Sequence, residues 1–163
     1  MSDERTDWIK ALVNEAKARQ DAADSHARLA DKIRSETQSL LHQILEAVRR
    51  DVKRLNDELY HANIIAISEV SSTGFTIHKE YTPANSMSVE VKPEDHALEY
   101  TQTIYGDSNF QRSTNHTEKI DIVVGQDIND LRFMRGQHLL SFDDISRMLI
   151  VPVVRAGDNE QES

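Results

Sequence analysis

Residues 41–62 read LHQILEAVRRDVKRLNDELYHA, and their apolar side chains recur at alternating intervals of four and three residues. The positions with this spacing are Leu41, Leu45, Val48, Val52, Leu55, Leu59 and Ala62. Such spacing places a narrow apolar stripe along one side of an α-helix, and a stripe of this width is typical of a coiled-coil contact. We therefore predict that Leu41, Leu45, Val48, Val52, Leu55 and Leu59 form an oligomer interface.

The helix is expected to extend backwards over most of the first sixty residues, which contain neither Gly nor Pro. A helix over residues 7–60 would be roughly 80 Å long at about 1.5 Å per residue, longer than a domain of this size is wide. Its first half carries a weaker stripe, made of Trp8, Leu12, Ala16, Ala23, Ala30 and Ile33. Arg19 and His26 lie within this stripe, and its alanines bury little area each.

The two stripes are out of phase, because Ile33 and Leu41 do not fit one heptad frame. Residues 35–39, SETQS, cover this skip and are rich in side chains that compete for backbone hydrogen bonds. The sequence allows two interpretations, a continuous helix with a stutter or an antiparallel helical hairpin. We favour the continuous helix because neither Gly nor Pro marks a turn.

After Ala62 the apolar period changes to two residues, the period of strands with one buried face. Alternating segments at 65–67, 75–77, 87–91, 98–104 and 120–124 predict four to five antiparallel strands. A loop is expected from Gly106 to about Thr117. A last helix over 141–150 begins with Ser141 and Asp144, spaced as a capping box, and presents Phe142, Ile145 and Leu149 to the sheet.

These elements predict an α+β fold, in which a long coiled-coil helix precedes a small antiparallel meander packed against a short C-terminal helix. We expect three regions: an oligomerising helix over 1–62, a small acidic head over 63–155 and a disordered acidic tail over 156–163.

Charge and composition narrow the classes of partner. Residues 1–60 hold 12 acidic and 11 basic side chains, whereas the rest holds 16 and 8, so the acidity is concentrated in the second half. Such a head favours a basic protein partner and disfavours nucleic acid. The 163-residue chain has no cysteine, no targeting signal and no apolar run long enough to span a membrane, so we expect a cytoplasmic protein without disulfides.

Few residues suggest a catalytic or metal-binding role. Glu90 and Lys92 lie two apart on a predicted strand, which is similar to the arrangement in metal-dependent nucleases of the restriction-endonuclease type, but a solvated strand face is the better explanation of the pair. The seven histidines lack the spacing of zinc ligands, and Ser141 near His138 is explained by a helix cap. We expect no cofactor, no metal and no catalytic residue.

The sequence therefore predicts a non-enzymatic interaction module, such as an adaptor, scaffold or assembly component, that oligomerises through its N-terminal helix. Its head would bind a partner through the polar sheet face, with Glu90, Glu99, Thr101 and Asp121 as candidate contacts, or through the loop near Gly106. Two alternatives are a small acidic chaperone-like or immunity-like protein that covers a basic partner, and a metal-dependent nuclease or hydrolase using Glu90 and Lys92.

Overall fold

The computed structural model describes residues 2–79, 85–105, 113–125 and 130–155. Helix α1 (Ser2–Leu55) leads into a π-helix, η1 (Asn56–Tyr60), and the chain ends in helix α2 (Phe142–Arg155). Between them lie β1 (Ile65–Ser68), β2 (Gly74–Lys79), β3 (Asn85–Lys92), the short 3-10 helix η2 (Pro93–Asp95), β4 (Ala97–Tyr105), β5 (Ser113–Val124), β6 (Leu131–Arg135) and β7 (His138–Leu140).

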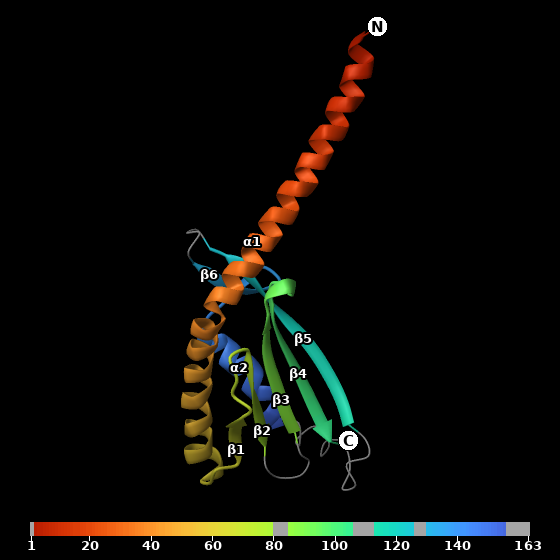
Figure 1. Cartoon of the computed structure of the whole chain (residues 1–163). Helices are drawn as coiled ribbons and strands as arrows, with labels where there is room; N and C mark the ends of the chain where they lie inside the picture. Colours follow the sequence, from red (N-terminus) through yellow and green to blue (C-terminus); the bar gives the residue numbers. More distant parts are fainter. Residues whose placement is uncertain (1, 80–84, 106–112, 126–129, 156–163) are drawn as a thin grey trace.

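Within the described residues the strands form one seven-stranded sheet, in which each strand pairs antiparallel with the next along the chain. Figure 1 shows α1 rising far out of this head, with the N-terminus at its tip. The predicted α+β fold is confirmed: a long N-terminal helix, an antiparallel meander and a short C-terminal helix.

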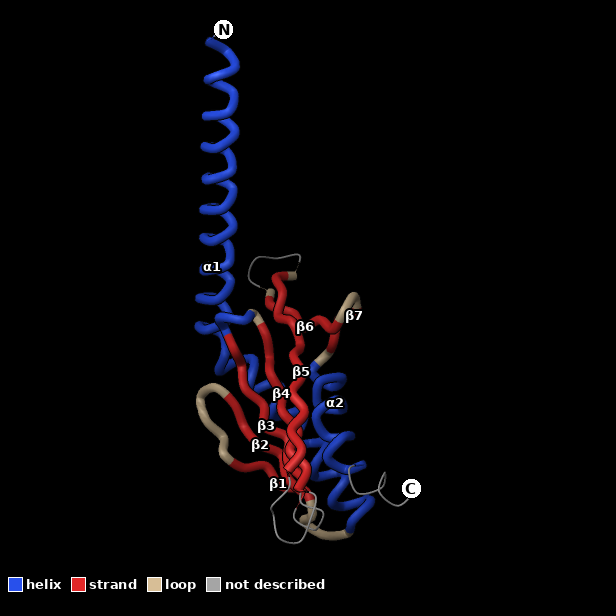
Figure 2. The backbone as a smooth tube through the Cα atoms, turned by 90° about the vertical axis from the view of Figure 1, so that its right-hand side faces the viewer, coloured by secondary structure: helices blue, strands red, loops and turns tan. Residues whose placement is uncertain are grey.

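Helices cover one face of the sheet. Along β3, Met87, Val89 and Val91 are buried, whereas Ser88 and Glu90 on the opposite face are exposed. Figure 2 shows α2 lying along one side of the strands, and the second half of α1 completes the same hydrophobic core. No described helix lies on the other side of the sheet, the outer sheet face, as expected for an antiparallel sheet with one solvated face.

Helix α1 is continuous through residues 35–39, so the prediction of a continuous helix is confirmed and the helical hairpin is wrong. Thr37 Oγ1 donates a hydrogen bond to the Ile33 carbonyl at 2.7 Å, and Ser35 Oγ donates one to the Lys32 carbonyl at 2.8 Å. Hydroxyl bonds to the preceding turn often bend a helix. In Figure 1, α1 changes direction near the level at which it reaches the head.

The apolar stripe of residues 41–52 belongs to the core of the chain itself. Leu41, Leu45, Val48 and Val52 are only 6%, 7%, 0% and 6% exposed, and they pack in one cluster with inner-face residues of the sheet and with α2. These four side chains are therefore not available to a partner helix, which corrects the role predicted for them. We call residues 30–55 the bound segment of α1.

The end of the bound segment is fixed by Asn56, a buried polar residue. Its side-chain oxygen accepts hydrogen bonds from the backbone amides of Ile64 and Ile65 at 3.1 and 3.0 Å, and its Nδ2 donates to the Ile65 carbonyl at 2.9 Å. Because all these groups lie at the start of β1, Asn56 joins the helical region to the first strand. His61, which has a positive φ of 52°, ends the π-helix between them.

Helix α2 begins as predicted. The Ser141 amide donates to Asp144 Oδ2 at 2.9 Å, and the Asp144 amide donates to Ser141 Oγ at 3.1 Å, which is a reciprocal cap. Ile145 and Leu149 are fully buried, and Phe142 packs against the core. At the other end, the free carbonyls of the last turn accept hydrogen bonds from Asn85 and Gln102 of the sheet.

The structure also departs from the predicted strands. β6 and β7 were not predicted, and β5 begins at Ser113, inside the stretch predicted as a loop. The remainder of that loop, residues 106–112, and the predicted disordered tail over 156–163 lie outside the described residues.

Candidate functional site

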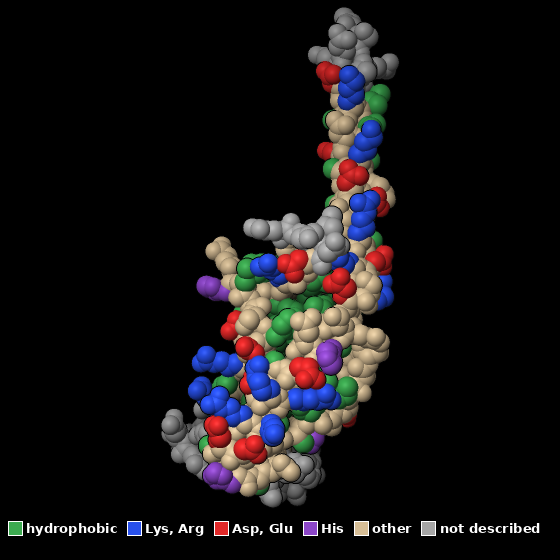
Figure 3. All heavy atoms as spheres, turned by 90° about the vertical axis from the view of Figure 1, so that its left-hand side faces the viewer, with side chains coloured by type: hydrophobic (Ala, Val, Ile, Leu, Met, Phe, Trp, Pro, Cys, Tyr) green, Lys and Arg blue, Asp and Glu red, His purple; other side chains and the backbone are tan. Residues whose placement is uncertain are grey.

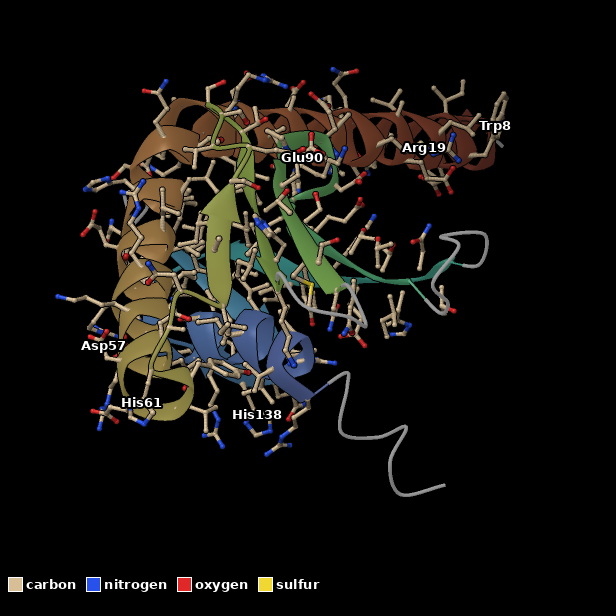
Figure 4. The ribbon with its side chains drawn as sticks, turned by 90° about the horizontal axis from the view of Figure 1, so that it is seen from below. Trp8, Arg19, Asp57, His61, Glu90 and His138 are labelled. Carbon is tan, nitrogen blue, oxygen red and sulfur yellow. The ribbon has the colours of Figure 1, made fainter. Side chains whose placement is uncertain are left out.

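The first 22 described side chains of α1, residues 7–28, are all exposed, and we call them the free segment. They form a rod roughly 33 Å long, which the head contacts at His26 without burying it. Near its tip, Trp8, Ile9, Leu12 and Val13 are 56%, 48%, 53% and 46% exposed. Figure 4 labels Trp8 and Arg19 on the first half of α1, and Figure 1 shows that this half extends beyond the head. Four large apolar side chains gathered in two turns are unusual for a surface that meets only water.

The exposed apolar side chains belong to the same face of α1 that, from residue 30 onwards, packs against the head. From Ile9 a spacing of three and four residues leads through Leu12, Ala16, Arg19, Ala23 and His26 to Ala30 and Ile33. Ala30 and Ile33 are 3% and 0% exposed because the head covers them. The exposed face of the free segment is therefore continuous with the buried face of the bound segment.

The free segment is electrically balanced. It contains four acidic and four basic side chains, in contrast to the acidic remainder of the chain. Figure 3 shows the two signs interleaved along the projecting helix. Self-association of this segment would therefore meet no net repulsion.

Where the free segment reaches the head, His26 and His96 meet. Their ring centroids are 4.0 Å apart, and His96 Nε2 lies 2.9 Å from the His26 carbonyl oxygen. Arg34 also hydrogen-bonds Glu94 of η2. These contacts fix the point from which the free segment leaves the head.

Two members of the predicted oligomer interface remain at the surface. Leu55 is partly buried, and Leu59 is 56% exposed. Both line a groove of about 730 Å³ between the end of α1 and α2, with Arg50 and Arg54 at its border. The predicted interface is thus divided between core positions and this groove.

The predicted partner contacts Glu90, Glu99, Thr101 and Asp121 lie together on the outer sheet face. Glu90 and Glu99 are opposite each other in β3 and β4, and both carboxylates have cationic neighbours. Lys92 Nζ lies 3.1 Å from Glu90 Oε2, and Lys119 Nζ lies 4.0 Å from Glu99 Oε2. The face is therefore locally compensated and does not form one acidic field.

A row of hydroxyl groups crosses the same face. Strand register aligns one hydroxyl residue from each of five neighbouring strands: Ser68, Thr76, Ser88, Thr101 and Thr117. Thr101 Oγ1 and Thr117 Oγ1 are 2.9 Å apart, within hydrogen-bond distance. The outer sheet face is thus polar, with small side chains along this row.

Glu90 and Lys92, the proposed catalytic pair of the nuclease alternative, form an ion pair with each other. The hydrogen bond to Glu90 raises the pKa of Lys92, with a smaller Coulombic contribution from the same carboxylate. Across the described ranges, no group of three or more His, Asp or Glu side chains is placed to hold a metal ion.

A polar cluster under α2 was not predicted from the sequence. Tyr100 Oη donates to Glu118 Oε2 at 2.6 Å, Arg135 Nη2 donates to the same oxygen at 3.0 Å, and His116 Nε2 lies 3.0 Å from Glu118 Oε1. Burial, followed by the bond to Glu118, raises the pKa of Tyr100 to about 12. The bonds from Tyr100 and His116 lower the pKa of Glu118. At neutral pH the cluster therefore holds a neutral tyrosine and a carboxylate.

Comparison with known protein families, with curated proteins and with solved structures finds no match to this chain. None of the helices in the described part of the chain has the length and hydrophobicity needed to cross a membrane.

Proposed function

We propose that this protein is a non-enzymatic interaction module that pairs with a second copy of itself through the free segment of α1. The observation that carries the proposal is the exposure of Trp8, Ile9, Leu12 and Val13 on a helix that the rest of the described chain leaves uncovered. The head has its own core, to which the bound segment contributes, so the proposed contact leaves that core intact. The coiled-coil prediction is thereby moved from residues 41–59 to residues 7–28.

A second copy suits this face because the two ends of the free segment differ in size. Large apolar residues lie near the tip, and Ala22, Ala23 and Ala27 lie near the head. In an antiparallel pair the large residues of one helix meet the alanines of the other, which lets the helices approach closely and bury the large side chains. A parallel pair would instead place alanines against alanines.

The heptad frame allows antiparallel registers that differ by seven residues, and we propose the one that pairs the whole free segment. If Ile9 faces His26 of the second copy, Leu12 faces its Ala23 and Ala16 faces its Arg19. This register aligns residue 7 with residue 28, so the paired length is the free segment. It also brings Arg19 near Glu15 of the second copy, whereas a parallel pair would oppose the two Arg19 guanidiniums.

Light scattering over a range of micromolar concentrations tests the proposal. The wild-type chain should approach twice its 18.6 kDa mass, and Leu12→Glu should remain monomeric because the pair would bury a carboxylate. Ala18→Glu is the matched control: it adds the same charge to the same helix, about 120° around the axis from Leu12. It should leave the dimer intact.

A wild-type chain that is monomeric at every concentration would refute the pairing. If Leu12→Glu and Ala18→Glu weaken the dimer equally, the added charge alone explains the loss of dimer.

A basic protein partner for the acidic head stays a prediction. The ion pairs of Glu90 and Glu99 on the outer sheet face give it less support than the overall charge suggested.

A further inference from the structure

A cavity of about 330 Å³ lies between α2 and the strands that carry the Tyr100 cluster. Its size is within the range of small-molecule sites. Its apolar lining comes from Met87 of β3 and from Met148, Val151 and Pro152 of α2. Its polar lining includes Tyr100, Glu118 and Arg135. The cavity thus has the mixed lining of a site for an amphipathic ligand.

The charge of Glu118 is already compensated inside this lining. Its carboxylate accepts hydrogen bonds from Tyr100 and Arg135, and Arg135 Nη1 also donates to Tyr100 Oη at 3.4 Å. Because the pKa of Tyr100 is raised and that of Glu118 is lowered, this arrangement keeps its charges near neutral pH. Arg135 and Glu118 together contribute no net charge to the cavity.

Arg147 of α2 lines the same cavity and differs from Arg135 in its partners. Among the described residues its guanidinium has no hydrogen bond and no salt bridge. Its charge contributes to the lowered pKa of Asp144, three residues earlier, whose carboxylate is used in the cap with Ser141. Arg147 therefore brings to this lining a guanidinium whose fork of donors is available.

We propose that this cavity binds a small organic carboxylate, with the carboxylate on Arg147 and an apolar body against Met87 and Met148. A guanidinium matches a carboxylate in a bidentate geometry, and the thioether side chains adapt to an apolar body. A dianionic phosphate is disfavoured because the single positive charge of Arg147 matches a monoanion, whereas Arg135 is already paired with Glu118. An uncharged apolar ligand leaves Arg147 unpaired.

Methyl NMR of the full-length protein with 2-naphthoate as the probe tests this site. The chain has four methionines, and two of them, Met87 and Met148, line the cavity, whereas Met134 is directed to the outer sheet face. The probe should shift the methyl signals of Met87 and Met148 and leave that of Met134 in place. The uncharged 2-naphthamide should bind at least about tenfold more weakly, since a charge-assisted hydrogen bond contributes that much or more.

Arg147→Gln should weaken 2-naphthoate binding by about tenfold or more, and Arg132→Gln, on the outer sheet face, should not change it. Arg147 also borders the groove between α1 and α2, so Arg54→Gln tests whether the probe binds there instead. Equal binding of the amide and the acid would overturn the proposal. So would a 2-naphthoate affinity that depends on Arg54 while the Met87 signal stays fixed.

Discussion

The two halves of α1 have related apolar patterns and different surroundings. In the bound segment, Ile33, Ile44 and Val48 are fully buried by the sheet and α2, whereas in the free segment Ile9 and Leu12 are about half exposed. A stripe at spacings of three and four residues shows that a helix face is apolar, but does not show what covers it. Coverage is decided by tertiary contacts, which differ along this one helix.

Charge in the bound segment should have the largest effect. Val48→Glu places a carboxylate in the core without a partner and should lower the free energy of unfolding by more than about 3 kcal/mol. Thermal unfolding by circular dichroism measures this. Leu12→Glu is the comparison in the free segment and should leave the melting temperature of the monomeric head nearly unchanged. If the Val48→Glu chain stays folded as a monomer, Val48 is not essential to the core, and the 41–52 stripe would again be a candidate oligomer interface.

The junction between α1 and the sheet should be the next most sensitive. Asn56→Ala removes three hydrogen bonds, two of them to the amide and carbonyl of the buried Ile65, so we expect a loss of about 2–4 kcal/mol. The exposed Asn63 provides the control, because Asn63→Ala should change stability by less than about 0.5 kcal/mol. Similar losses in both variants would mean that Asn56 does not tie the bound segment to β1.

Acid should destabilise the head through Glu118. Its pKa is lowered in the folded state by hydrogen bonds from Tyr100 and His116, so below its ordinary value of 4.5 the unfolded state takes up more protons. The resulting stability is present above that pH and is lost as pH falls towards the folded pKa. Urea unfolding at a series of pH values measures the slope, which should be shallower in Glu118→Gln. An unchanged slope would show that this carboxylate is not responsible.

Tyr100 extends the same reasoning to alkaline pH. Its pKa is raised from 10.0 to about 12, so stability should fall as pH rises from 10 towards 12. Ultraviolet difference titration should show one late-ionising tyrosine that is absent in Tyr100→Phe. Ionisation of all tyrosines near pH 10 in the folded protein would contradict the burial of this hydroxyl.

Much of this fold could be predicted because periods of 3.5 and 2 residues report helices and half-buried strands directly. β7 has only three residues, too few to establish a period, and β5 begins with polar residues such as Asn115. The cluster of Tyr100, Glu118 and Arg135 was missed because register across three strands brings together residues up to 35 positions apart. The apolar pattern within a single strand does not reveal how that strand is aligned with its neighbours.

The smallest effect on stability should come from removing the free segment. A chain beginning at residue 29 keeps Ala30 and the rest of the bound segment, so its head should unfold within about 0.5 kcal/mol of the full-length monomer. The same chain should no longer self-associate. A truncated chain that still dimerises would place the contact on the head, for example in the groove beside Leu59.

Disulfide trapping tests the pairing of free segments most directly, because the natural chain has no cysteine. Leu12→Cys and Ala23→Cys chains are prepared separately, then oxidised alone and as an equimolar mixture. The antiparallel register places Leu12 opposite Ala23 of the second copy, so the mixture should yield a covalent heterodimer far more readily than either chain yields a homodimer. Efficient homodimers of Leu12→Cys alone would show a parallel pair, and no cross-link in any sample would contradict pairing through the free segment.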